Sequence, residues 1–362
     1  MKYLLALLPL LLPACSGPAK RNGSDPAPPE PFEQVAGEAT INDTARFLAG
    51  RPVRRGAVLS RLQKDPQYQQ FSKNTLGKWK YRSSRRIADQ REWEATHLRP
   101  LIGRPRTLFY PFGGPDLMHA LALFPDASTY VLLGLEPAGN APDLEREDPL
   151  AVLRSIPGHE KSMQTQLMHG YFITKDMKND LSNGPLQGVT PILLSSLALM
   201  DAQVTAVRPL TAAGNPAVQI DFNLPGAGRK TMIYVSGDVS NRGFNSAYQS
   251  WLSSYSHSVA YFKAASYLMQ DSGFTSIRSW VLENCRAVVQ DDSGIPYKSF
   301  DPAKWDIHLF GAYQAPIDFF SKHTQPDLRA AYAAAGAVPP LTFGSGYQLE
   351  PGGANLTVAV RR

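Results

Sequence analysis

One segment of the chain constrains its fold more than any other. Residues 107–112 (TLFYPF) form an apolar run that predicts a short buried strand, and the Gly and Pro of residues 113–116 (GGPD) predict a tight turn. Residues 117–124 then predict a helix, and residues 129–135 (TYVLLGL) predict a second buried strand, which Glu136 follows directly. Strand, glycine turn, helix and strand in this order are typical of a βαβ unit whose first turn faces a ligand.

The rest of the chain extends this α/β pattern. Three β-rich runs, separated by Gly, Pro and Asn, predict a meander or hairpin, and three later runs predict further strands. These strands are expected over residues 203–210, 217–224, 230–236, 285–290, 305–313 and 355–361, and helices over residues 244–270, 275–283 and 327–335. We therefore predict an α/β domain over residues 107–362, a Rossmann-like three-layer sandwich with a mixed sheet and a helical N-terminal elaboration.

That elaboration, residues 32–106, is locally basic. Its segment 78–106 carries nine Lys or Arg against three Asp or Glu. Trp79, Tyr81 and Trp93 stand among these charges, a mixture that suits stacking on a sugar or base, or contact with anionic lipid headgroups. A solvated basic helix face with aromatic rings packed inward explains the same pattern.

The first fifteen residues indicate export and a lipid anchor. Lys2 precedes an apolar run over residues 3–12, which is too short to span a bilayer and is typical of a signal peptide. Leu12-Pro13-Ala14-Cys15 resembles the lipobox of bacterial lipoproteins, and this likeness implies cleavage of residues 1–14 and lipidation of Cys15. Acyl chains on Cys15 would hold the protein at a membrane surface. An ordinary secretory signal with an incidental cysteine is the alternative.

The residues after the anchor predict a tether. Residues 15–31 are rich in Pro, Ala and small polar residues and have no apolar face. Ser16 follows the cysteine, and by resemblance to enterobacterial sorting it favours the outer membrane, with the protein facing the periplasm. With Cys15 lipidated, Cys285 has no partner for an intramolecular disulfide, so we expect Cys285 to be a buried structural thiol.

Several phrases of the α/β domain resemble those of an uncharacterised family of bacterial envelope lipoproteins. They are FYPFGGPD at residues 109–116, LFPDA at 123–127, GLEP at 134–137, QDDSGIPY at 290–297 and FGAY at 310–313. The resemblance covers about residues 40–362 and implies an envelope location, but it implies no activity and no catalytic residue.

The first βαβ unit also resembles the class I methyltransferase-like fold. In that fold a glycine turn after the first strand approaches a nucleoside cofactor, and an acid after the second strand binds the ribose. Gly113, Gly114 and Glu136 stand at those places in the same order, whereas Pro111 and Phe112 replace the usual acid and first glycine. The resemblance therefore implies a shared fold and leaves the cofactor unknown.

Acidic residues directly follow three of the predicted strands. Asp116, Glu136 and the pair Asp291/Asp292 are expected to meet in one cleft, because ligands of open α/β sheets bind outside the carboxyl ends of the strands. We predict Asp116, Asp291 and Asp292 as catalytic acid or base groups, since adjacent carboxylates shift each other's pKa. The alternatives are a helix cap at Asp116 and a simple turn at Asp291-Asp292-Ser293-Gly294.

Six residues are predicted to bind a ligand in this cleft: Tyr110, Gly113, Gly114, His119, Glu136 and Ser293. His119 lies one helical turn after Asp116, although a histidine packed in the core explains its position equally well. The seven histidines show no zinc-binding spacing, so we predict no metal site. No GxSxG elbow and no GxxxxGK[ST] phosphate loop occurs in the sequence.

These observations lead to three hypotheses of function. The first is a lipid-anchored cell-envelope protein with a ligand-binding or accessory role, whose cleft takes a small polar ligand or a glycan. The second is an envelope hydrolase or group transferase that uses Asp116 or Asp291/Asp292 as acid and base. The third is a structural lipoprotein that binds anionic lipid or polysaccharide through residues 78–106. A net charge of +6 over the whole chain is too small to indicate a nucleic-acid partner.

Overall fold

The computed structural model of the protein describes residues 37–172, 177, 179–182 and 184–362. The chain divides into two units, Met1–Glu33 and Gln34–Arg362, and every described residue belongs to the second unit. The predicted signal peptide, the lipidation site Cys15 and the tether lie outside the described residues. In the part of the chain that is described, no helix has both the length and the hydropathy of a membrane span.

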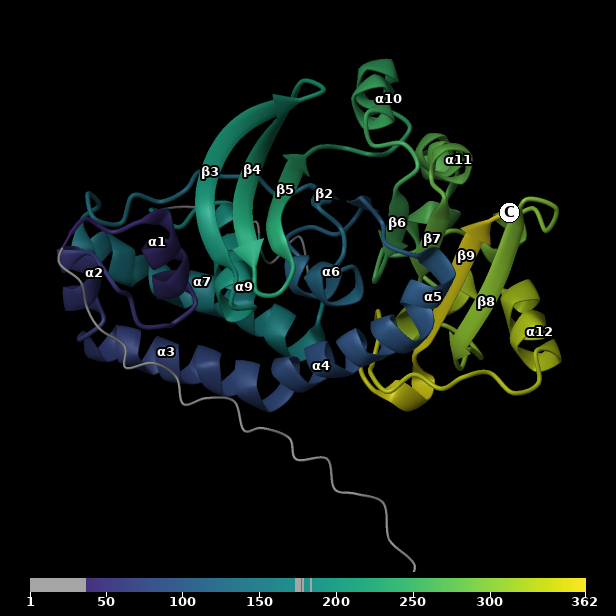
Figure 1. Ribbon diagram of the computed structural model, residues 1–362, viewed down its shortest axis with the longest axis horizontal. Coiled ribbons are helices and arrows are strands. Elements are labelled where there is room, and N and C mark those ends of the chain that lie inside the picture. Colours follow the sequence, from purple (N-terminus) through teal and green to yellow (C-terminus); the bar gives the residue numbers. More distant parts are fainter. Residues whose placement is uncertain (1–36, 173–176, 178, 183) are drawn as a thin grey trace, which may run out of the picture. The chain divides into compact units, whose positions relative to one another are not determined.

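A mixed sheet forms the centre of the second unit (Figure 1). Its nine strands among the described residues are β1 (Thr107–Tyr110), β2 (Thr129–Gly134), β3 (Gln203–Ala212), β4 (Asn215–Leu224), β5 (Gly228–Ser236), β6 (Val259–Phe262), β7 (Ala287–Gln290), β8 (Trp305–Gly311) and β9 (Asn355–Arg361). Their spatial order is β3-β4-β5-β2-β1-β6-β7-β9-β8. The five central strands, β5 to β7 in that order, are mutually parallel, and antiparallel strands extend the sheet at both edges.

The helices of the described residues precede, connect and flank these strands. They are α1 (Ile41–Leu48), α2 (Ala57–Leu62), α3 (Pro66–Lys78), α4 (Ser84–Trp93), α5 (Arg99–Ile102), α6 (Leu117–Leu123), α7 (Pro149–His169), α9 (Thr190–Leu199), α10 (Ser246–Ser253), α11 (Thr275–Asn284) and α12 (Pro326–Ala334). Short π-helical turns at η1 (Trp79–Ser83) and η2 (Glu94–Leu98) join α3, α4 and α5 into one long row (Figure 1). Short 3-10 segments are η3 (Leu268–Gln270), η4 (Ser272–Phe274), η5 (Tyr297–Ser299), η6 (Asp318–His323), which is kinked at Phe320, and η7 (Pro351–Gly353).

Helices cover both faces of the sheet. Side chains alternate along β1, so that Leu108 and Tyr110 join one buried apolar cluster while Phe109 joins another. The first cluster contains side chains from all the helices between α1 and α9 in chain order, so the basic N-terminal helices pack on the same core as the central strands. The second cluster contains side chains from α10 and α11. This arrangement confirms the predicted α/β class and mixed sheet.

The chain reverses its direction of travel across the sheet beside β1. It adds β2 and then β5 on one side of β1, and it then crosses back to add β6 and β7 on the other side. The connections after β1 and after β6 therefore run to opposite sides of the sheet, and the place between these two strands is a topological switch point. In open α/β sheets, ligands bind at such a point, at the carboxyl ends of the strands.

Most predicted elements agree with the structure, and one is wrong. The predicted meander is the antiparallel β3-β4-β5 unit, and the strands β1, β2, β7, β8 and β9 lie within two or three residues of their predicted bounds. The stretch 244–270 is not one helix: it contains α10, the strand β6 and the turn η3. All four side chains of β6 are buried, so the strand lacks the alternating polarity that distinguishes a strand from a buried helix segment. The sequence patterns predicted neither α7 nor α9.

Candidate functional site

A pocket opens at the carboxyl ends of β1, β2, β5 and β6. About 820 Å³ of space lies between its surrounding atoms, the open solvent at its mouth included. Its walls come from residues that end or directly follow these four strands, together with Tyr171, Phe172 and Phe274. The pocket therefore lies beside the switch point between β1 and β6.

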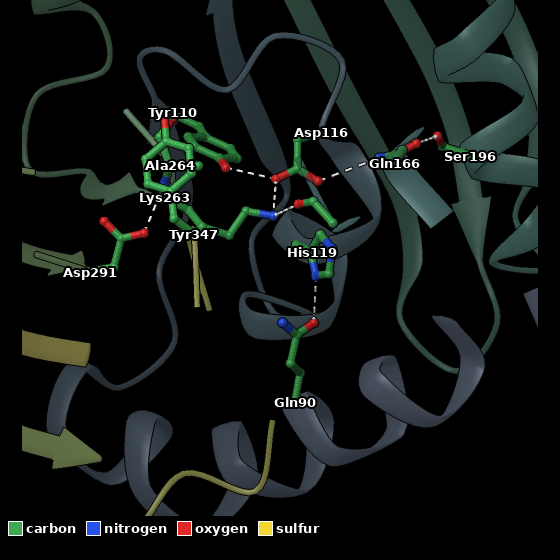
Figure 2. Close-up of polar contacts among 11 residues, drawn as sticks. Gln90, Tyr110, Asp116, His119, Gln166, Ser196, Lys263, Ala264, Asp291 and Tyr347 are labelled. Carbon is green, nitrogen blue, oxygen red and sulfur yellow. Dashed lines mark hydrogen bonds and ion pairs between the residues drawn. The ribbon is translucent and has the colours of Figure 1, made fainter. Parts of the chain in front are cut away.

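Asp116 and Lys263 form a buried ion pair in this pocket. Lys263 Nζ lies 2.6 Å from Asp116 Oδ2, and the Tyr110 hydroxyl donates to the same oxygen at 2.7 Å (Figure 2). Gln166 donates to Asp116 Oδ1 at 3.4 Å, and Lys263 also donates to the backbone carbonyl of Gly170. Asp116 occupies the N-cap position of α6, yet its carboxylate accepts no hydrogen bond from the first turn, so the simple cap that was the alternative for this residue is wrong.

The protonation states of this cluster follow from its burial and its charges. Burial by itself would raise the pKa of Asp116, but the Lys263 ammonium beside it holds that pKa below its ordinary value. The pKa of Lys263 is lowered because burial outweighs the opposing effect of Asp116. Burial and the Asp116 carboxylate raise the pKa of the Tyr110 hydroxyl well above its ordinary value. Tyr110 is therefore a neutral donor beside an ionised carboxylate.

His119 lies behind the pocket rather than in its wall. Its ring is buried between α6 and α4, where His119 Nδ1 lies 2.9 Å from Gln90 Oε1 (Figure 2). With a carbonyl oxygen as partner, Nδ1 carries the proton of the neutral ring. Burial, together with the nearby Lys263 ammonium, lowers the pKa of His119 to about 3. The predicted ligand-binding role of His119 is therefore not supported by its position.

Glu136 presents a buried carboxylate to the pocket. It is only 3% exposed, and the Tyr234 hydroxyl donates to its backbone carbonyl at 2.9 Å and to Oε2 at 3.2 Å. Gly134 lets the carboxylate take this position, since a Cβ atom on Gly134 would lie 2.5 Å from Glu136 Oε2 and displace it. Gly114, which is at φ +51°, faces the same oxygen, and a Cβ there would lie 3.6 Å away. The predicted pocket residues Gly114 and Glu136 are thus brought together by two neighbouring strands.

Gly113 and Phe112 complete the turn after β1. A Cβ atom on Gly113 would lie 2.7 Å from the Tyr110 ring, so only glycine lets the turn pass over that ring. Phe112 has φ +62°, a conformation that is costly for an aromatic residue, and its half-buried ring lines the pocket 5.6 Å from the Phe274 ring. Leu135 lines the pocket as well and is 54% exposed.

Asp291 does not line the pocket. Its carboxylate accepts from the backbone amides of Ala264 at 2.9 Å and Ser293 at 2.8 Å, and from the Ser293 hydroxyl. Figure 2 shows Asp291 and Asp116 on opposite sides of the Lys263 side chain. Burial, with the adjacent Asp292 carboxylate, raises the pKa of Asp291 to about 6. Three donors, one from the loop after β6 and two from the turn after β7, thus occupy the Asp291 carboxylate.

Asp292 and Ser293 are occupied in the same way. Asp292 accepts from the Tyr267 hydroxyl at 2.6 Å and from Asn355 Nδ2 at 3.0 Å, while Ser293 Oγ accepts from the Ala265 amide at 2.8 Å. Neither residue lines the pocket. The acidic residues after three predicted strands were expected to share one cleft. This prediction is right for Asp116 and Glu136. It is wrong for Asp291 and Asp292, because their carboxylates accept hydrogen bonds from the chain's own backbone and side-chain groups.

The loop after β6 is the part of the site that the sequence did not reveal. Ala264, Ser266 and Tyr267 all have positive φ, between 50° and 58°, and such strain in a pocket wall is frequent at functional sites. The Tyr347 hydroxyl holds the loop, donating to the Ala264 carbonyl at 2.9 Å and accepting from the Ser266 amide at 3.1 Å. The sequence patterns did not identify Lys263, because they predict a helix where β6 lies. The sequence signal for this residue is a lysine that directly follows a short apolar run.

Two further expectations concern metals and thiols. Within the described residues, no group of three or more His, Cys, Asp or Glu side chains could hold a metal ion. Cys285 is fully buried 3.4 Å from the Ser258 hydroxyl, as predicted for a structural thiol, and burial raises its pKa to about 12.

Comparisons of the chain with models of protein families, with curated proteins and with solved structures give no match. What the pocket can do therefore follows from its own geometry. An ionised pair at Asp116 and Lys263, a buried carboxylate at Glu136 and a rim of aromatic and aliphatic side chains can orient a small molecule that has both polar and apolar parts.

Proposed function

We propose that this protein is a lipid-anchored protein of the bacterial cell envelope that binds a small molecule in the pocket at the carboxyl ends of its parallel strands. The binding role is supported above all by the position of the Glu136 carboxylate. It is buried in the wall of a preformed pocket and accepts a hydrogen bond from one hydroxyl group of the protein, that of Tyr234. A buried carboxylate gains from a ligand that donates hydrogen bonds to it.

The order of the parallel strands supports a Rossmann-like three-layer sandwich. If the five parallel strands are numbered along the chain, their order in the sheet is 3-2-1-4-5. This is the order of doubly wound dinucleotide-binding sheets, which bind ligands at the switch point beside the first strand. The order also supports the resemblance to the class I methyltransferase-like fold, and we infer a common architecture from it without assigning a cofactor.

The protonation states of the pocket residues Asp116 and Tyr110 favour binding over acid–base catalysis. A catalytic acid or base works best with a pKa near the operating pH. Asp116 is held below its ordinary pKa and Tyr110 well above, so neither exchanges a proton readily near neutrality. The carboxylates of Asp291 and Asp292 accept hydrogen bonds from backbone and side-chain donors, and neither residue lines the pocket. The enzyme hypothesis thus loses the residues on which it depended.

The basic helices support a second candidate role, contact with an anionic surface. Trp93 is buried against the Phe310 ring at 5.1 Å, so it belongs to the core. Tyr81 is 85% exposed and stands between the exposed Lys80 and Arg85. An exposed aromatic ring between cations suits the headgroup region of an anionic membrane. Charge reversal of Lys80 and Arg85 should then reduce retention on anionic vesicles, and unchanged retention would end this candidate role.

The anchor is tested with the full chain in a bacterial host that lipidates its own lipoproteins. The wild-type protein should fractionate with membranes, and its N-terminal peptide should begin at Cys15 with the mass of diacylglycerol and a further acyl chain. Cys15→Ser should move the protein to the soluble fraction. A wild-type N-terminus without lipid at Cys15 would refute the anchor.

The binding role is tested by native mass spectrometry of the full chain, purified from native membranes in a non-ionic detergent. We expect a small-molecule adduct that Leu135→Trp removes by filling the pocket mouth. Leu150→Trp is the matched control, because Leu150 is 62% exposed and does not line the pocket. An adduct that survives Leu135→Trp, or no adduct in any variant, would contradict the proposed role.

A further inference from the structure

We propose that the pocket takes an organic cation, a substituted ammonium whose charge faces Glu136 and whose apolar groups contact the aromatic rim. This inference rests on the proposed binding function and names its ligand class. It is carried by the charges that line the pocket and by the rings that surround them.

The charges of the pocket lining do not balance. Among the described residues, four ionisable side chains other than tyrosine line it: Asp116, Glu136, Asp238 and Lys263. Lys263 is the one cation of these four, and Asp116 binds it in the buried ion pair. Over the described part of the chain, neither Glu136 nor Asp238 has a cationic partner. The pocket therefore carries two carboxylates whose charge a ligand can compensate.

The two carboxylates differ in how much they gain from a cation. Asp238 is exposed and already accepts from the Ser240 amide and hydroxyl, both at 2.8 Å. Glu136 is 3% exposed, its Oε2 atom packs directly against Gly134, and the residue lines the pocket. A ligand that closes over Glu136 removes its remaining water, so the ligand must bring a compensating charge. Glu136 is therefore the principal counter-ion, and Asp238 adds attraction from solvent.

Aromatic rings supply the other half of an organic-cation site. Phe112, Tyr171, Phe172 and Phe274 are half-buried and line the pocket. The face of an aromatic ring is electronegative and attracts ammonium groups, and its carbon atoms pack against the alkyl substituents. Phe112 keeps its ring at this wall in spite of φ +62°, a backbone conformation that is unfavourable for a residue with a Cβ atom.

The same groups exclude other ligand classes. An anion would meet two uncompensated carboxylates, since the charge of Lys263 already serves Asp116. A neutral molecule of the same shape would contact the rings but leave Glu136 desolvated without a counter-charge.

The probes for the test are choline and benzyltrimethylammonium, with 3,3-dimethyl-1-butanol as the uncharged isostere of choline and benzoate as an anion. Isothermal titration with the full chain in non-ionic detergent measures each Kd. We expect at least one cation to bind at least about tenfold more tightly than the isostere and the anion. Cations that bind no more tightly than the isostere would overturn the inference.

Variants link that binding to the pocket. Glu136→Gln should weaken the cation at least about tenfold and leave binding of the uncharged isostere unchanged, whereas Glu147→Gln, an exposed carboxylate outside the pocket, should change neither. Leu135→Lys places a positive charge at the pocket mouth and leaves residue 136 as glutamate. It should also weaken binding of the cation, and Leu150→Lys is its control. Cation binding that is insensitive to both pocket variants would overturn the inference.

The two proposals fail differently. If Leu135→Trp removes a native adduct but neither cation binds selectively, the ligand class is wrong and the binding function stands. If native adducts and probe binding are both insensitive to the pocket variants, the binding function fails and the ligand class fails with it.

Discussion

Lys263 Nζ lies 2.6 Å from Asp116 Oδ2, and both side chains are 3% exposed. Asp116 follows β1 and Lys263 follows β6, the two parallel strands between which the connectivity of the sheet reverses. The ion pair therefore ties together the two halves of the sheet at the point where the pocket opens.

Removing one partner of this pair should destabilise the protein strongly. Asp116→Asn or Lys263→Met each leaves an uncompensated or half-satisfied group in the core, and each should lower the free energy of unfolding by about 3–5 kcal/mol. The double variant should cost less than the sum of the two, since neither charge then remains alone. Urea-induced unfolding measures these changes. Arg154→Ala is the control, because the Arg154–Asp148 pair is 71% and 57% exposed and should contribute less than about 1 kcal/mol. Single variants no more costly than Arg154→Ala would contradict the structural role of the pair.

The buried Asp291 should make stability fall as pH rises. The pKa of Asp291 is raised from 3.8 to about 6, so the folded protein favours the protonated carboxyl more than the unfolded chain does. Its stabilising contribution is complete below the unfolded pKa and is lost as pH rises through the folded pKa. Asp292, whose pKa is also raised by burial, acts in the same direction. Urea unfolding from about pH 4 to about pH 7 should show wild type losing stability relative to Asp291→Asn. A difference between the two proteins that is flat, or that grows in favour of wild type, would be inconsistent with this burial.

A single methyl group beside Glu136 should disrupt the pocket. A Cβ atom at Gly134 would lie 2.5 Å from Glu136 Oε2, 2.6 Å from the Tyr234 hydroxyl and 3.0 Å from Gly114 Cα. Gly134→Ala should therefore displace the carboxylate, abolish the native adduct and cost about 1–3 kcal/mol of stability. Gly77→Ala, in an exposed turn of α3 with nothing within 4 Å, should instead stabilise by about 0.5–1 kcal/mol. Thermal unfolding and native mass spectrometry of both variants make the comparison, and a Gly134→Ala protein with a normal adduct would show that this wall is not needed.

His119 should stay neutral through the physiological range. Burial lowers its pKa to about 3, so the unfolded chain binds a proton on this ring at higher pH than the folded protein does. Its contribution to stability is present above the unfolded pKa and is lost as pH falls toward the folded pKa. Carbon-detected NMR of the ring, assigned with His119→Gln, should show no titration between about pH 5 and about pH 8. A midpoint inside that interval would mean that the ring is open to solvent.

The sequence revealed the half of the site that is local in the chain. Gly113, Gly114, Asp116 and Glu136 belong to one βαβ unit of about 30 residues, where strand, turn and helix signals follow one another without interruption. The order of that unit alone places the turn after the first strand beside the end of the second. Local sequence signals are therefore enough to assign these four positions to a pocket.

The other half depends on contacts between distant segments. The four residues of β6 are buried on both faces of the sheet, so their sequence cannot be distinguished from a buried segment of a helix. Without a predicted strand end at Phe262, there was no reason to assign Lys263 to the site. The hydrogen-bond partners of Asp291 could not be predicted either. They include the backbone amide of Ala264, which lies in a strained loop and reaches the carboxylate only in the folded chain. A pair of acids after a strand is compatible with catalysis or with a turn, and only the partners of their oxygens decide between the two.

The most direct measurement of the central claim is a crystal structure of the full chain purified from its native membrane. We expect electron density for a co-purified small molecule between the Phe112 ring and the Glu136 carboxylate, with the Asp116–Lys263 pair intact. A small molecule bound elsewhere on the protein, with solvent alone between Phe112 and Glu136, would contradict the claim that this pocket is the binding site.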